Sequence, residues 1–65
     1  MKVRDMLRKL RADGWVVVRQ RGSHRQLHHP TKPGTVTVAG PLSQDIAKGT
    51  ERAILRQARL LEEDQ

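Results

Sequence analysis

The sequence predicts an α+β domain in the order helix, three strands, helix, with both helices on one face of an antiparallel sheet. Apolar residues recur at helical spacing near both ends of the chain. Between them, β-branched residues cluster or alternate with polar ones, and glycines and prolines mark the turns. With 65 residues and no cysteine, the chain is expected to form one small domain without disulfide bonds.

The first helix is expected over residues 2–12. Its apolar residues fall on one stripe, at i, i+3, i+4 and i+7: Val3, Met6, Leu7 and Leu10. Basic residues fill the other side of the helix. Gly14 provides a suitable end, because glycine readily takes the left-handed conformation that often follows a helix.

A β-hairpin follows the first helix. Residues 15–20 are mostly β-branched or aromatic, as in a strand, and residues 23–29 form a second strand that Pro30 ends. Arg21 and Gly22 are expected to form the turn between the two strands. Trp15 is expected to pack among the core valines.

The second strand predicts which side chains face the core. Leu27 is its only apolar residue, so the face that carries Leu27 should point toward the helices. The residues with the same parity are Ser23, Arg25 and His29, and the alternate residues are His24, Gln26 and His28. We therefore expect His24 on the open face of the sheet, close to the start of the strand.

The rest of the chain completes the sheet and adds the second helix. A third strand is expected over residues 35–39, with Val36 and Val38 facing inward. Ser43 is expected to cap a short turn that runs to Lys48. The predicted core residues are Leu7, Leu10, Val18, Leu27, Val38, Ile54 and Leu55.

The final helix should begin at a threonine cap. Thr50 is expected to be that cap, with Glu51 in the first turn, where a negative charge is favourable. The apolar stripe of the helix is formed by Ile54, Leu55, Ala58 and Leu61.

The charge of the chain predicts a polyanionic partner. Thirteen Lys and Arg oppose seven Asp and Glu, and three of the acids lie in residues 62–64, so residues 1–61 carry +9. This balance points most simply to nucleic acid, with a merely soluble basic surface as the alternative. No segment has the apolar run of a signal peptide or membrane span, and the lack of cysteine suits a reducing cytoplasm.

Residues 19–25 concentrate the candidate functional groups. The imidazole of His24 exchanges protons near neutral pH, which makes it the candidate general acid or base. Arginines attract phosphate, and the start of the last helix is a further site for anions. The candidate RNA-binding residues are Arg19, Arg21, Gly22, Ser23, Arg25 and Lys48.

Metal binding is not expected. The three histidines are His24, His28 and His29, and strand parity sends two of them to one face and the third to the other. No cysteine or nearby carboxylate completes a ligand set. The sequence therefore predicts no metal and no other cofactor.

With the elements placed, the chain resembles the HicA family of small mRNA interferases from HicA–HicB toxin–antitoxin pairs. The resemblance rests on Gly14-Trp15, Arg19-Gln20, Gly22-Ser23-His24, His29-Pro30, Val36-Thr37-Val38, Lys48-Gly49-Thr50 and the run from Ile54 to Ala58. It implies a fold like a double-stranded-RNA-binding domain, metal-free cleavage of mRNA, and a HicB-like antitoxin that covers the active site. The family's catalytic histidine corresponds to His24.

Three positions depart from the family pattern. Gly40-Pro41 stands where the family often has a histidine after the third strand, and Glu51 replaces a leucine. Arg59 replaces the glycine that usually follows Gln-Ala, which predicts that the last helix runs on to about Glu63.

Two other functions remain open from the sequence. The same fold could bind double-stranded RNA by shape without cleaving it, although Lys48 is the only lysine at the start of the last helix. Alternatively, the chain is a basic architectural or ribosome-associated protein, in which His24 has no chemical role. Cleavage of a labelled RNA separates the toxin from both alternatives.

Overall fold

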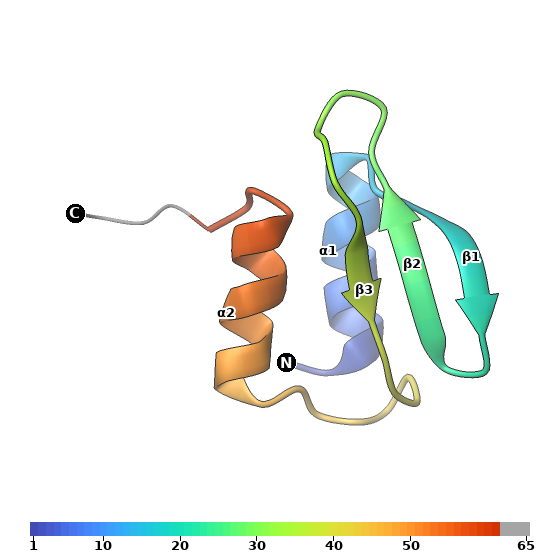
Figure 1. Ribbon diagram of the computed structural model, residues 1–65. Helices are drawn as coiled ribbons and strands as arrows, with labels where there is room; N and C mark the ends of the chain where they lie inside the picture. Colours follow the sequence, from blue (N-terminus) through green and yellow to red (C-terminus); the bar gives the residue numbers. More distant parts are fainter. Residues whose placement is uncertain (62–65) are drawn as a thin grey trace.

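A computed structural model, which describes residues 1–61, confirms the predicted order of elements (Figure 1). The elements are α1 (Val3–Asp13), β1 (Val16–Arg21), β2 (His24–His28), β3 (Val36–Val38) and α2 (Lys48–Gln57). The strands form an antiparallel sheet in the order β1-β2-β3. In Figure 1, α1 lies behind the sheet and α2 beside β3, so the front face of the sheet is left open.

The core lies between the two helices and the sheet face that points toward them. Its fully buried side chains include Trp15, Leu27 and Val36, together with the apolar stripe of α1. This arrangement confirms the inward parity of Leu27 on β2 and the packing of Trp15. Neither α1 nor α2 has the length and apolar character of a membrane-spanning helix.

A β-bulge in β1 makes one core prediction wrong. Val17 pairs with Leu27 and Arg19 pairs with Gln26, so Val18 is an extra residue with no partner on β2. Val18 is 53% exposed, whereas Val17 is partly buried against the core. The bulge allows Val17 to face inward while Arg19 faces outward, which a regular strand would forbid at that separation.

The hairpin turn lies one residue later than predicted. β1 continues through Arg21, which pairs with His24, so the two-residue loop is Gly22-Ser23. Gly22 has φ 56°, and a positive φ at the first loop position is what a type II′ turn requires. A Cβ on Gly22 would contact nothing, so its conformation rather than lack of space calls for glycine.

The segment before α2 does not form the predicted capped turn. It lies along the start of α1, where the carbonyls of Gln44 and Leu42 accept hydrogen bonds from the first backbone N–H groups of that helix. These bonds replace a side-chain cap. Helix α2 begins at Lys48 after Ala47, so Thr50 lies inside the helix and is not its cap.

Both helices end in the same hydrogen-bonded motif. After α1, the N–H groups of Gly14 and Trp15 bond to carbonyls of the last turn, and Gly14 has φ 111°. After α2, Arg59 and Leu60 make the equivalent bonds, and Arg59 has φ 58°. The prediction that α2 runs on is therefore wrong: it ends at Gln57, and Glu63 lies outside the described residues.

Lys32, in the β2–β3 loop, ties the ends of the two helices together. Its Nζ lies 2.6 Å from Asp13 Oδ2 and donates to the carbonyl of Ala58 at 3.2 Å. The Lys32 ammonium lowers the pKa of Asp13 below its usual value of 3.8. His29 joins the same cluster, because its Nε2 donates to the Asp13 carbonyl and its Nδ1 accepts the N–H of Thr31.

The two left-handed positions should respond to substitution in opposite directions. Arg59→Gly is expected to raise the free energy of unfolding by up to about 1 kcal/mol, because it relieves a conformation that costs side chains about 1–2 kcal/mol. Gly14→Ala should lower it by at least about 1 kcal/mol, because the new Cβ would also lie 2.7 Å from His29 Nε2. Urea unfolding of both variants measures these changes. A destabilising Arg59→Gly would contradict the assigned helix end.

The Asp13–Lys32 pair predicts a pH-dependent stability difference. Asp13→Asn should lower the free energy of unfolding at neutral pH, because the ionised carboxylate is bound more favourably in the folded protein. The difference from wild type should shrink as pH falls below 3.8 and Asp13 becomes protonated. Urea unfolding between pH 2.5 and 7 tests this expectation. Asp5→Asn is the control, since Asp5 makes only an exposed 3.4 Å pair with Arg8.

Candidate functional site

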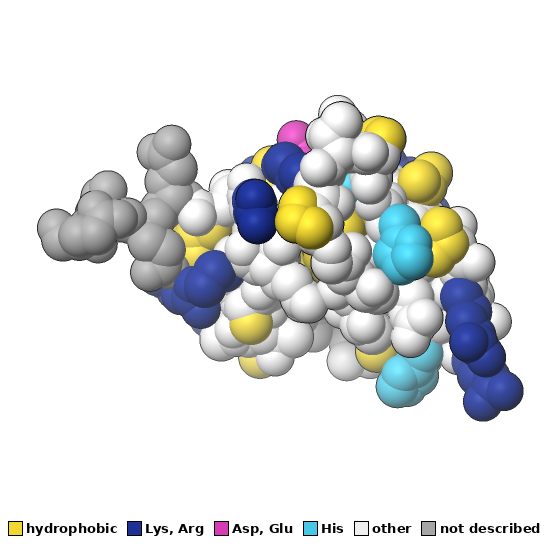
Figure 2. All heavy atoms as spheres, turned by 45° about the horizontal axis from the view of Figure 1, so that its top comes forward, with side chains coloured by type: hydrophobic (Ala, Val, Ile, Leu, Met, Phe, Trp, Pro, Cys, Tyr) yellow, Lys and Arg dark blue, Asp and Glu magenta, His cyan; other side chains and the backbone are white. Residues whose placement is uncertain are grey.

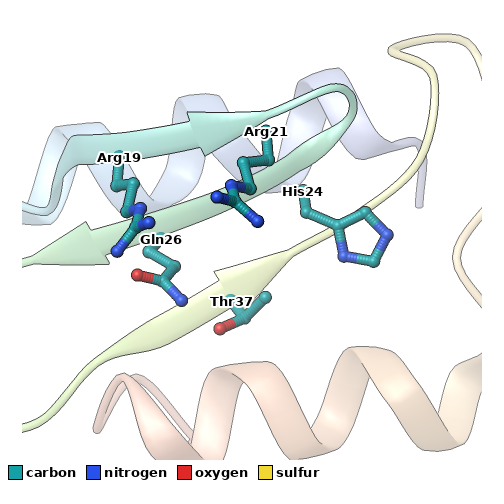
Figure 3. Close-up of a pocket in the computed structure, with 5 residues that line it drawn as sticks. All are labelled: Arg19, Arg21, His24, Gln26 and Thr37. Carbon is teal, nitrogen blue, oxygen red and sulfur yellow. The ribbon is translucent and has the colours of Figure 1, made fainter.

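An open depression of about 520 Å³ lies on the sheet face that the helices leave free (Figure 3). Its lining residues come from all three strands: Arg19 and Arg21 from β1, His24 and Gln26 from β2, and Thr37 from β3. Of the predicted site residues, it brings together Arg19, Arg21 and His24.

The strand register explains why these side chains meet. Residues directly opposite each other in an antiparallel pair point to the same face, with Cβ atoms about 4.5–5.5 Å apart. Arg21 is opposite His24, and Arg19 is opposite Gln26, which in turn faces Thr37 on β3. The depression therefore consists of two cross-strand rows, separated by two residues or about 6.4–6.8 Å.

His24 is exposed and lies at the first position of β2, directly after the hairpin turn. Within the described chain its ring makes no hydrogen bond, so both ring nitrogens are available to a ligand. Arg21 is the nearest cation by register. An imidazole beside a guanidinium on an open surface can exchange a proton with a bound phosphodiester.

The carboxylates of residues 1–61 all lie away from the depression and are paired with other groups. The pairs are Asp5–Arg8 at 3.4 Å, Asp13–Lys32 at 2.6 Å, Asp45–Lys2 at 3.4 Å and Glu51 with the amino terminus at 3.8 Å. Among residues 1–61, no acid therefore neutralises Arg19 or Arg21. Figure 2 shows Lys, Arg and His side chains exposed on this side of the molecule.

The structure places Arg25 away from this face. Its side chain is buried on the helix side of the sheet, at 8% exposure, and its Nη1 donates to the carbonyls of Ser23 and Gly40, each at 3.0 Å. It joins the hairpin loop to the segment after β3. Arg25 therefore holds the backbone next to His24 and has no surface on which to bind phosphate.

The remaining predicted RNA-binding residues lie outside the depression. Gly22 and Ser23 form the hairpin loop beside it, and Ser23 contributes its carbonyl to Arg25. Lys48 is exposed at the start of α2. These three residues can contact only a ligand that extends beyond the lining side chains.

The three histidines do not converge. His24 and His28 lie four residues apart on the open face, where His28 Nε2 hydrogen-bonds Thr35 Oγ1 at 3.0 Å. His29 packs edge-to-face against Trp15 on the other side, with ring centroids 5.2 Å apart. Among the described residues, no three His, Asp or Glu side chains form a group able to hold a metal ion.

Two lining residues, Gln26 and Thr37, were not among the predicted site residues. Strand parity did place Gln26 on the open face, and Thr37 alternates with two inward valines. No sequence pattern indicated that these two polar residues would lie side by side in the depression. That juxtaposition depends on the pairing of β2 with β3.

A comparison with protein-family models finds a match over nearly the whole described chain. The family described as HicA toxin of bacterial toxin–antitoxin matches residues 3–60. A search of curated proteins finds no significant match.

Arg25 and Arg21 should differ in their effect on stability. Arg25→Ala is expected to lower the free energy of unfolding by about 1.5–3 kcal/mol, because it removes two hydrogen bonds from a charged donor and leaves two carbonyls without it. Arg21→Ala should change it by less than about 0.5 kcal/mol, since that side chain is exposed. Thermal and urea unfolding of the two variants measure the difference. Equal effects would contradict the structural role of Arg25.

Proposed function

This chain belongs to the HicA toxin family, and from that premise we propose that it is an endoribonuclease that cleaves mRNA. In this proposal it is the toxin of a type II toxin–antitoxin system, uses no metal, and is neutralised by a HicB-like antitoxin. The observation that carries the proposal is the position of His24 opposite Arg21, in a depression without carboxylates.

The reaction begins with attack by an RNA 2′-hydroxyl on the adjacent phosphorus. The bond from phosphorus to the 5′-oxygen of the next nucleotide then breaks, which leaves a 2′,3′-cyclic phosphate and a 5′-hydroxyl. One proton leaves the attacking oxygen and another reaches the departing oxygen. His24 transfers one of these protons as general base or general acid, and water carries the other.

Arg19 and Arg21 bind the phosphate and stabilise the additional negative charge of the transition state. Their guanidinium groups remain charged throughout and transfer no proton. Arg25 supports the reaction indirectly, because it fixes the backbone on both sides of the hairpin loop that precedes His24.

The antitoxin is expected to cover the same depression. A partner that binds here must supply negative charge, because the described residues offer Arg19 and Arg21 without an acid of their own. Such a partner would exclude RNA by occupying its site and need not alter the fold. Its charges should also accelerate association at low salt.

His24→Ala separates proton transfer from binding. The variant is expected to fold like wild type and retain its affinity for RNA. Its rate of RNA cleavage should fall by about 10²–10⁴-fold. Arg21→Ala should instead weaken RNA binding and make its salt dependence shallower, because one phosphate contact is lost. Cleavage should persist in EDTA, and a 2′-deoxy substitution at the cut site should abolish it.

The same experiments distinguish a nuclease from a module that binds RNA without cleaving it. Full cleavage by His24→Ala, on RNA free of contaminating nuclease, would rule out the proposed mechanism. RNA binding without any cleavage by the wild-type protein would identify the chain as a binding module.

A further inference from the structure

The side-chain amide of Gln26 has no hydrogen-bond partner in the described chain, unlike the amides of two other glutamines. Gln20 donates its amide to the carbonyl of Gly22 at 2.9 Å, and Gln57 donates to the carbonyl of Thr35 at 2.6 Å. The side chain of Gln26 makes no hydrogen bond within the described residues, although it lies at the centre of β2 and lines the depression. Its donor and acceptor are both available to a ligand.

The side chains next to Gln26 add further polar groups that could contact a nucleotide. Arg19 lies opposite it on β1 and Thr37 lies opposite it on β3, so the three side chains form one row across the sheet. Figure 3 shows the amide of Gln26 extending toward Thr37. The row contains one cation and two uncharged hydrogen-bonding groups, whereas the neighbouring row contains Arg21 and His24.

We propose that Gln26, together with Thr37, binds the edge of the base next to the phosphate that His24 faces, and that it favours adenine. This inference rests on the proposed function in placing a phosphodiester at His24. The distance between the two rows, about 6.4–6.8 Å, separates Gln26 and Thr37 from Arg21 and His24. The nucleotide chain would then run along β2.

The preference for adenine follows from the amide itself. A glutamine side chain presents one donor and one acceptor side by side, and it pairs with N6 and N7 of adenine through two hydrogen bonds. Bases of single-stranded RNA expose these edges to protein side chains. Thr37 adds a hydroxyl that can donate or accept beside the amide.

Binding of uncleaved RNA tests the proposal. The full chain carrying His24→Ala is titrated with short uridine tracts that contain a single central A, C, G or U, and fluorescence anisotropy gives each affinity. We expect the tract with adenine to bind about fivefold to tenfold more tightly than the others. Adding Gln26→Ala should remove that preference, and Gln26→Glu should move it toward cytosine, because a carboxylate accepts from the cytosine amino group.

Gln20→Ala provides the matched control. Gln20 pairs with Arg25 in the register, so it lies on the opposite face of the same sheet, and its loss should leave the preference for adenine unchanged. Equal binding of the four tracts, or a preference that survives Gln26→Ala, would overturn the inference. A preference that depends on Gln26 in a protein whose wild type cleaves no RNA would support base binding and refute only the nuclease proposal.

Discussion

The alternation of side chains along β2 is the constraint on which the rest of the structure depends. Leu27 and Arg25 point into the protein, and His24 and Gln26 point out of it. A shift of the strand by one residue would expose Leu27 and bury an imidazole and an amide, which is costly on both counts. The burial of Leu27 therefore fixes the position of the functional face.

Some basic side chains stabilise the fold, and others are left exposed on the open face of the sheet. Arg25 is buried against two carbonyls, and Lys32 joins Asp13 to the end of α2. These contacts keep several ionisable groups away from the open face. Arg19 and Arg21 thus remain available there, whereas Arg25, the next arginine along the chain, serves the fold.

The sequence predicted the parity of β2, and with it the exposure of His24, because this strand has a single apolar residue. It did not predict the bulge, since three consecutive valines fit either face and only pairing with β2 shows that Val18 is the extra residue. It also missed the buried role of Arg25, which depends on the carbonyl of Gly40 after β3. The predicted end of α2 was wrong because Arg59 adopts the left-handed conformation, which glycine usually takes.

The proposed function requires that RNA binds the open face of the sheet. The most direct test is an NMR titration of the protein with a 2′-O-methyl RNA that resists cleavage. We expect the ring signals of His24 and the side-chain amide of Gln26 to shift, while the side-chain amides of Gln20 and Gln57 stay unchanged. Shifts confined to the arginine and lysine side chains of α1, with His24 and Gln26 unchanged, would contradict it.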